Sequence, residues 1–340
     1  MKLLVTGHLG YLGVEMTSRL LAAGHEVVGL DVDYFADCDF VAPPDDVPNL
    51  RTDLRDVEPA ELEGFDAVIH LAALSNDPLS DLNPDLTYDI NLHASVRLAT
   101  AAKQAGVPRF LFSSSCSLYG AGGGELLDEN AAFNPVTPYG ESKVRVEQAL
   151  SKLADDAFTP VYLRNATAFG ASRRLRADIV VNNLVGHAVT TGKVLLQSDG
   201  TPWRPLVHVF DISHAFEQAL VAPRDAVHDE AFNVGRTGEN YRIRDIANQV
   251  AEVVPGCEVA FAEGASADAR DYQVDFSKIE AQLPGYVPEW TLRRGIEQLY
   301  DAYSGAGLTW EAFDGWHYHR LRTIQRRLQL HELDDGLRWT

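Results

Sequence analysis

The first half of the chain alternates short apolar runs with segments whose apolar residues recur at helical spacing. Runs of this length, rich in Val, Leu, Ile and Phe, are typical of buried strands. They predict strands at residues 2–6, 26–31, 67–72, 110–114 and 161–164. The helical spacing predicts helices at residues 11–23, 88–105 and 138–153.

The order of these elements indicates the fold class. Strands that alternate with helices form a parallel sheet with helices on both faces. We therefore predict an α/β protein with a Rossmann-type, doubly wound parallel sheet in residues 1–165. After about residue 165 the pattern is mixed, with a strand-like run at residues 231–234. This change predicts a smaller mixed α/β domain for the substrate, which comprises residues 166–204 and 241–340 with a C-terminal tail, while about 205–240 rejoin the first domain.

Composition narrows the classes of function. The formal net charge of -20 leaves little basic surface for nucleic-acid phosphates. No apolar run approaches the roughly 20 residues of a spanning helix, and the chain begins with a strand-like run instead of an export signal. The three cysteines are too scattered for a disulfide framework or a CxxC metal pair. We expect a cytoplasmic protein that binds no nucleic acid, membrane or metal.

A glycine-rich turn joins the first predicted strand to the first predicted helix. Gly7, Gly10 and Gly13 form a GxxGxxG pattern. Such glycines let backbone N–H groups approach a pyrophosphate at a helix N-terminus. Asp31 closes the second strand, where a carboxylate accepts hydrogen bonds from a ribose diol and repels a 2′-phosphate. The pattern predicts NAD rather than NADP as cofactor, with a simple turn aspartate as the alternative reading of Asp31.

Two further strand ends carry weaker signals. Asp53 follows a third strand and could lie beside the adenine, although acidic loop residues are common. His70, Leu71, Ala72 and Ala73 end the next strand, where small side chains would let a dinucleotide lie close to the backbone. Core packing alone would also account for this second segment.

A tyrosine and a lysine four residues apart, Tyr139 and Lys143, share one face of the predicted helix at 138–153. The same spacing also arises by chance on solvated helices. Ser115 follows the strand at 110–114, at the sheet edge where parallel folds bind ligands. A lysine cation favours the phenolate form of a nearby tyrosine. Tyr139 could then accept a hydroxyl proton while Ser115 binds the oxygen and hydride passes to NAD, which is carbonyl chemistry without a metal.

Four segments, TGHLGYLG, HLAA, SSSCSLYG and PYGESK, resemble in order and spacing the extended short-chain dehydrogenase/reductase family of nucleotide-sugar epimerases and dehydratases. The resemblance covers about residues 1–300. It implies a nucleotide-sugar substrate, NAD, and a catalytic set of Ser115, Tyr139 and Lys143. It implies cofactor contacts from Gly7, Gly10, Tyr11, Leu12, Gly13, Asp31, Asp53, Leu54, Leu71, Ala72, Ala73, Asn91, Ser113, Tyr139 and Lys143. It implies substrate contacts from Ser75, Ser115, Cys116, Ser117, Thr167, Asn183, Leu184, Arg204 and Arg270.

The two residues after Ser115 distinguish among the reactions of this family. Its 4,6-dehydratases carry Asp-Glu there, and its sugar-acid decarboxylases carry Glu at the second position, whereas this chain has Cys116 and Ser117. Its 3,5-epimerases place a cysteine at the second position. Neighbouring strand positions face opposite ways, so we expect Cys116 to pack in the core. Ser117 resembles the small hydroxyl residue of 4-epimerases, which implies a 4-keto sugar that rotates before hydride returns.

The sugar is either a hexose or a uronic acid. Thr167 replaces an Asn of UDP-galactose 4-epimerases and resembles uronic-acid 4-epimerases instead. Arg173, Arg174 and Arg176 could hold a sugar carboxylate or lie solvated in a loop. Ordinary ion pairing is the alternative for Arg204 and Arg270.

Two other functions stay open at this point. One is a 4-dehydrogenase that releases a keto sugar and NADH. The other is a non-catalytic nucleotide-sensing or scaffold protein, against which the three intact catalytic residues speak. The helices at 88–105 and 138–153 resemble the pair that forms the dimer interface in this family, which implies a homodimer.

Overall fold

The computed structural model describes residues 1–75, 83–266 and 271–340. Its centre is a six-stranded sheet in which every neighbouring pair is parallel. The strands lie in the order β2 (Glu26–Leu30), β1 (Lys2–Thr6), β3 (Ala67–His70), β4 (Arg109–Ser115), β6 (Thr159–Asn165) and β10 (Glu230–Val234). The order in which the chain adds strands to the sheet reverses between β1 and β3. Ligands of such folds bind at the carboxyl edge beside this switch point.

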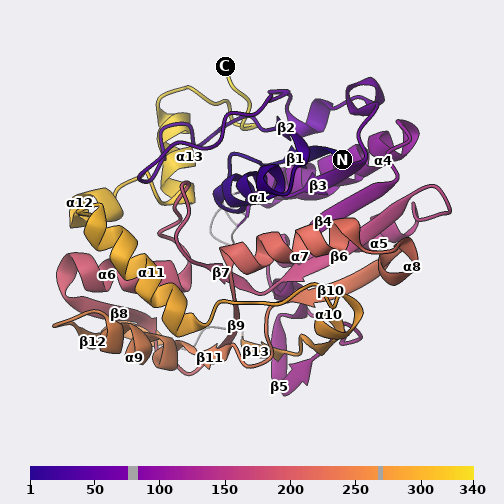
Figure 1. Ribbon diagram of the computed structural model, residues 1–340. Helices are drawn as coiled ribbons and strands as arrows, with labels where there is room; N and C mark the ends of the chain where they lie inside the picture. Colours follow the sequence, from indigo (N-terminus) through magenta and orange to yellow (C-terminus); the bar gives the residue numbers. More distant parts are fainter. Residues whose placement is uncertain (76–82, 267–270) are drawn as a thin grey trace.

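Helices cover both faces of this sheet (Figure 1). On one face Leu3 and Val5 pack with Met16 of α1 (Tyr11–Ala22), beside α7 (Val209–Val221) and α10 (Ser277–Gln282). On the other face Leu4 packs with Leu98 of α4 (Ser95–Gln104), beside α5 (Pro138–Ser151). Successive strand residues point to opposite faces, so burial of both faces accounts for the continuous apolar runs. The predicted Rossmann-type, doubly wound sheet is confirmed.

Two elements differ from their predicted form. The third strand that was predicted directly before Asp53 does not form, and this segment contributes only an isolated bridge between Gly29 and Asn49. Pro48, next to that bridge, has no backbone N–H to extend a ladder. The predicted helix at 88–105 is divided into a π-helical segment η3 (Tyr88–Ala94) and α4. A π-helical turn shifts the side chains that follow it, so the two segments present different faces.

Smaller sheets and helices form the remainder of the molecule (Figure 1). One sheet comprises β7 (Thr167–Phe169), β9 (Trp203–His208) and β11 (Asn240–Arg242). Two strand pairs join β8 (Lys193–Ser198) to β12 (Glu258–Ser266) and β5 (Ala121–Leu127) to β13 (Asp271–Val274). A separate apolar core lies among α6 (Val180–Thr191), α9 (Ile243–Val253) and α11 (Leu292–Gly305). The division of the chain into two domains stays a prediction.

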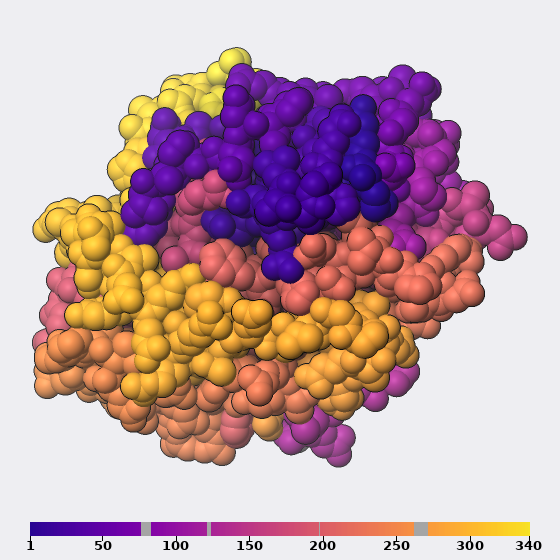
Figure 2. All heavy atoms as spheres, in the orientation of Figure 1, coloured from indigo at the N-terminus to yellow at the C-terminus, as the bar shows by residue number. Residues whose placement is uncertain are grey.

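Short helical segments complete the chain: η1 (Leu54–Asp56), η2 (Pro59–Leu62), α3 (Pro84–Thr87), η4 (Cys116–Tyr119), α8 (Arg224–Val227), α12 (Trp310–Phe313) and α13 (Arg320–Gln329). In Figure 2 the yellow atoms of the C-terminal residues lie against the indigo and purple atoms of the N-terminal part. The end of the chain therefore returns to the large sheet. Across the described ranges, no helix has the length and apolar character to span a membrane.

Candidate active site

A cavity of about 790 Å³ opens at the carboxyl edge of the large sheet, where the loops after β1, β2, β3, β4 and β6 meet. Most of the predicted site residues line it. They are Gly7, Gly10, Tyr11, Leu12, Gly13, Asp31, Asp53, Leu54, Leu71, Ala72, Ala73, Ser75, Ser113, Ser115, Ser117, Tyr139, Lys143, Thr167, Asn183, Leu184 and Arg204. Residues far apart in the sequence therefore share one site because parallel strands bring their carboxyl ends together.

The glycine turn between β1 and α1 is packed too tightly for side chains. Gly7 has a φ of 71°, and a Cβ there would lie 2.7 Å from the backbone N of Ala72. A Cβ on Gly13 would lie 2.1 Å from the carbonyl oxygen of Gly7. No side chain caps the N-terminus of α1 at Gly10, and no acidic residue lies in its first turn. The backbone cradle and the uncapped helix N-terminus fit the pyrophosphate of a dinucleotide.

Asp31 lies at the end of β2 with its carboxylate in the cavity wall. The carboxylate accepts hydrogen bonds from the backbone N of Leu9 at 3.1 Å and of Asp33 at 2.7 Å. Burial raises the pKa of Asp31, and these two hydrogen bonds oppose the shift. A carboxylate held in this way can accept hydrogen bonds from a ribose diol. Asp53 also lines the cavity, but its carboxylate is paired with Arg55 Nη2 at 2.7 Å.

Two serine hydroxyls lie together after β4. The Ser117 hydroxyl donates to Ser115 Oγ at 2.9 Å, and the backbone N of Ser117 donates to the same oxygen at 3.2 Å. Ser115 is the N-cap of the 3₁₀ helix η4, which begins immediately after the strand. This turn brings both hydroxyls into the cavity wall.

Helix α5 carries Tyr139 and Lys143 on the face that lines the cavity. Lys143 is only 3% exposed; its Nζ donates to the carbonyl oxygen of Ser113 at 2.7 Å and lies 5.4 Å from the Tyr139 ring centroid. Burial lowers the pKa of Lys143 to about 7, while the charge of Glu147 opposes this shift. The arrangement places a buried amine beside the tyrosine ring.

A buried ion pair lies behind this helix. Arg164 of β6 contacts Glu147 of α5, with 2.7 Å between Nη2 and Oε2, and both side chains are buried. The Ser114 hydroxyl donates to Glu147 Oε1 at 2.5 Å. The pair fixes α5 against β6, the neighbour of the strand that ends at Ser115. The sequence contained a signal for it, because Glu147 lies four residues after Lys143 on the inward face of the same helix.

The side of the cavity that was predicted to bind the substrate is formed by β7, α6 and β9, which contribute Thr167, Asn183, Leu184 and Arg204. Arg204 is buried, and its Nη1 donates to the carbonyl oxygen of Trp203 at 2.8 Å.

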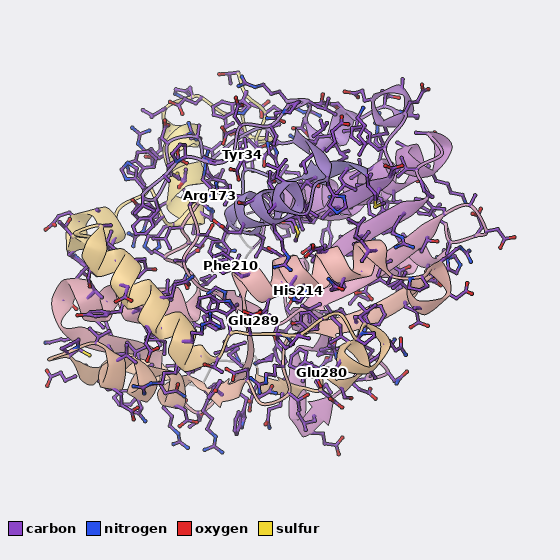
Figure 3. All side chains as sticks on the ribbon, viewed as in Figure 1. Tyr34, Arg173, Phe210, His214, Glu280 and Glu289 are labelled. Atoms are coloured by element: carbon purple, nitrogen blue, oxygen red, sulfur yellow. The ribbon has the colours of Figure 1, made fainter. Side chains whose placement is uncertain are left out.

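The three loop arginines have different positions. Arg173 binds Glu15 and Asp45, and it lies beside α1 in Figure 3. Arg174 is paired with Asp33 and Asp39. Arg176 alone among the three lines the cavity, where its Nη1 donates to Ser75 Oγ at 3.3 Å.

Two predicted residues in the described part of the chain are not found in the cavity wall. The buried amide of Asn91 binds the backbone N and O of Leu74, so Asn91 supports the loop after β3. Cys116 is buried and donates its thiol to the carbonyl oxygen of Arg164 at 3.1 Å; burial raises its pKa. The side chain of Cys116 packs in the core because it points away from the cavity wall to which Ser115 and Ser117 contribute. Arg270 lies outside the described residues.

Sequence reasoning missed part of the wall. Tyr34, Phe35 and Ile90 line the cavity, together with Arg320 and Ile324 of α13. None of them belongs to a motif, and α13 is about 290 residues away from β2 in the sequence. Within the described part of the chain, no group of three or more His, Cys, Asp and Glu side chains could hold a metal ion.

Several UDP-glucose 4-epimerases are similar to this chain. That of Bacillus subtilis (strain 168) is 30% identical over 328 residues, which cover 88% of this chain and 94% of the relative. That of Corynebacterium glutamicum is 28% identical over 324 residues, which cover 90% of this chain and 97% of the relative. The resemblance that the sequence motifs indicated is therefore confirmed over nearly the whole chain.

Solved structures and a family model agree with these relatives. A UDP-glucose 4-epimerase of Thermus thermophilus in complex with NAD is 27% identical, has a TM-score of 0.75, and matches 90% of this chain and 100% of its own. MoeE5 in complex with UDP-glucuronic acid and NAD is 26% identical with a TM-score of 0.78, over 90% of this chain and 100% of its own. Residues 3–235 match the model described as the NAD dependent epimerase/dehydratase family. The chain belongs to the NAD dependent epimerase/dehydratase family.

Proposed function

We propose that this protein is an NAD-dependent isomerase that epimerises a nucleotide sugar at C4 through a transient 4-keto sugar. One observation carries the proposal: Ser115, Ser117, Tyr139 and Lys143 line the same cavity as the glycine turn that begins at Gly7. A sugar hydroxyl can therefore meet a proton acceptor, two hydroxyl groups and a dinucleotide in one place. The UDP-glucose 4-epimerases among its relatives support the reaction class.

Each residue around the reacting carbon has a separate role. The glycine turn would hold NAD, which would supply reversible hydride transfer at C4. Tyr139, as phenolate, accepts the proton of the C4 hydroxyl, and Lys143 supports that charge when protonated. Ser115 and Ser117 hydrogen-bond the C4 oxygen and hold it near Tyr139. Arg204 offers a cation for the diphosphate of the substrate.

The acids of the cavity favour epimerisation over dehydration. The carboxylates in the described wall are Asp31, Asp53 and Asp178. Asp53 is paired with Arg55, and Asp178 Oδ1 is 2.9 Å from Arg176 Nε. Asp31 lies on the expected ribose side. Elimination of water needs an acid beside the leaving hydroxyl, and the residues after Ser115 supply a thiol and a hydroxyl in place of a carboxylate.

A uronic acid is favoured over a neutral hexose by the position of Arg176. Its guanidinium lies in the cavity wall, and its charge interacts electrostatically with Tyr139 and Asp178. Its Nε is paired with Asp178, so a substrate carboxylate would bind through its Nη groups. The carboxylate at C5 of a uronic acid lies next to C4, so it would lie near both Arg176 and the reacting carbon. MoeE5 is solved with UDP-glucuronic acid and with UDP-glucose, so the choice rests on Arg176.

The test compares substrates and variants. The purified protein is incubated with catalytic NAD and UDP-, TDP-, GDP-, ADP- or CDP-linked hexoses or uronic acids, and products are followed by proton NMR and absorbance at 340 nm. We expect a new anomeric signal from UDP-glucuronic acid without lasting NADH, and no signal from Tyr139→Phe. Arg176→Met should lose the uronic acid reaction, whereas Arg173→Met, which changes an arginine outside the cavity wall, should keep it.

Other outcomes have defined meanings. Stoichiometric NADH with a keto product would make the protein a dehydrogenase. Activity on UDP-glucose that equals activity on UDP-glucuronic acid would remove the role given to Arg176. No reaction with any TDP-, GDP-, ADP-, CDP- or UDP-linked sugar would favour a non-catalytic nucleotide sensor.

We also propose a homodimer that works in the cytoplasm. Helices α4 and α5 lie side by side at the surface, and the groove between η3, α4 and α5 is lined by Leu92, His93, Val96, Arg145, Gln148, Ala149 and Lys152. A second copy of this surface would cover the groove. Light scattering should give twice the 37.4 kDa of the chain, and His93→Glu with Arg145→Glu should return it to one chain.

A further inference from the structure

The C-terminal segment, residues 320–340, lies against the cofactor side of the cavity. Figure 1 shows α13 and the C-terminus beside β2 and α1, and apart from α6, α9 and α11. Ile324, Leu333 and Leu337 of this segment form an apolar cluster with Leu74, which follows β3. Ile324 also lines the cavity. The segment therefore completes the cavity wall rather than the separate core around α11.

Hydrogen bonds tie this segment to the loops after Asp31 and Asp53. Trp339 Nε1 donates to the carbonyl oxygen of Val32 at 2.6 Å, and the Tyr34 hydroxyl donates to that of Leu337. Arg55 Nη1 donates to the carbonyl oxygen of Gly336 at 2.7 Å. Figure 3 shows Tyr34 next to the yellow helix α13. The segment thus holds the two loops that carry the acids expected beside the adenosine.

Arg320, the first residue of α13, presents a buried cation to the cavity. It is 2% exposed and lines the cavity wall. Its Nη2 donates to the carbonyl oxygen of Arg174 at 3.0 Å, and its guanidinium lies 4.0 Å from the Phe35 ring centroid. Its Nη1 is buried and has no hydrogen-bond partner among the residues that the structure describes. A buried guanidinium with an unused donor is unfavourable unless an anion binds there.

The neighbours of Arg320 indicate which part of a dinucleotide it meets. Its charge interacts with Asp31 on the ribose side and with Arg176 and Asp178 on the side of Tyr139. The diphosphate of NAD joins its two ribose groups and lies between these ends. Asp178 is already paired with Arg176, so it does not use the free donor of Arg320. We therefore expect the Nη1 group of Arg320 to donate to an anion at the position of the diphosphate.

We propose that Arg320 binds the diphosphate of NAD through Nη1, so that the C-terminal segment is part of the cofactor site. The inference rests on the NAD site of the proposed function, but not on the reaction catalysed there. Guanidinium groups bind phosphate oxygens through short, charge-assisted hydrogen bonds. Phe35 and the carbonyl oxygen of Arg174 hold the guanidinium in place before the cofactor arrives. This preorganisation lowers the entropic cost of binding the cofactor.

The experiment measures binding without catalysis. NAD, ADP-ribose, adenosine and UDP are titrated into nucleotide-free full-length protein by calorimetry, with weak ligands measured by displacement. Arg320→Met should weaken NAD and ADP-ribose about 10- to 100-fold, the usual range for a hydrogen bond to a charged group. It should leave adenosine and UDP unchanged. Arg322→Met is the matched control, because Arg322 is exposed on the same helix and pairs with Asp314.

Each alternative result would overturn the assignment. Equal losses for adenosine and NAD would show a purely structural role, and a loss confined to UDP would assign Arg320 to the substrate. Unchanged NAD affinity would leave Arg320 without a cofactor role. If Arg320→Met does not fold, Arg320→Lys, which keeps the charge and most of the stem, should still weaken ADP-ribose at least about 3-fold with adenosine unchanged. Binding of NAD by the unaltered protein, measured in parallel, tests the cofactor site itself.

Discussion

Burial of the Lys143 amine should make the stability of this protein depend on pH in a definite direction. Burial lowers the pKa of Lys143 to about 7 in the folded protein, whereas an unfolded lysine has a pKa of about 10.4. Between these values the unfolded chain binds more protons than the folded one. The free energy of unfolding must therefore rise with pH across this window, and below pH 7 both states are protonated and the cost of the buried charge is fully present.

The magnitude follows from the same two values. One pH unit within the window changes the free energy of unfolding by about 1.4 kcal/mol for one such group. Replacement of Lys143 by Met keeps an unbranched side chain beside Phe112 and removes the titrating amine. The unaltered protein should thus gain about 1.4 kcal/mol relative to Lys143→Met between pH 8 and pH 9. Titrating groups that do not interact with Lys143 are shared by the two proteins and cancel in this difference.

The assay is urea unfolding of nucleotide-free protein, followed by tryptophan fluorescence at pH 7, 8 and 9. Lys193→Met, which removes an exposed lysine at the start of β8, is the control and should give a profile parallel to that of the unaltered protein. Parallel profiles for the unaltered protein and Lys143→Met would refute the reasoning, because they would mean that burial does not shift the pKa of the Lys143 amine.

Two further substitutions test the glycine turn and the buried ion pair that support the site. Gly13→Ala places a Cβ 2.1 Å from the carbonyl oxygen of Gly7, so the affinity for NAD, measured by calorimetry, should fall about 10- to 100-fold. The control is Gly238→Ala, whose Cβ meets no atom within 4 Å, and it should bind NAD normally. Equal affinities of the two variants would contradict the tight packing of the glycine turn. Arg164→Met leaves the buried carboxylate of Glu147 without its cation and should cost about 3–5 kcal/mol in urea unfolding, whereas the double variant with Glu147→Met should recover most of this loss. A double variant as unstable as the single one would show that the charge of Glu147 is not the cause.

Much of the fold was predictable because its signals are local. Strand β1 coincides with the predicted run at residues 2–6, since buried parallel strands need continuous apolar residues. The GxxGxxG turn and Asp31 were recognisable because a close backbone approach to a ligand allows few residue types at fixed spacing. Tyr139 and Lys143 share a helix face by periodicity alone. The missing strand before Asp53 was a local error, where Pro48 limits backbone pairing to a single bridge.

Tertiary structure decided which of several equivalent side chains reaches the cavity. Arg173, Arg174 and Arg176 look alike in the sequence, yet only Arg176 lines the cavity, because the first two are paired with acids from other segments. Cys116 and Ser117 differ in direction because η4 begins immediately after the strand.

The sequence by itself determined the sheet, the dinucleotide turn and the catalytic spacing of this protein, since each depends on residues close together in the chain. Only the tertiary structure placed the C-terminal segment over the cofactor side, through contacts such as that of Trp339 with Val32. Such contacts join residues about 300 positions apart and depend on complementary surfaces rather than on periodicity. For that reason Arg320, which no motif identifies, becomes part of the site only when the chain is folded.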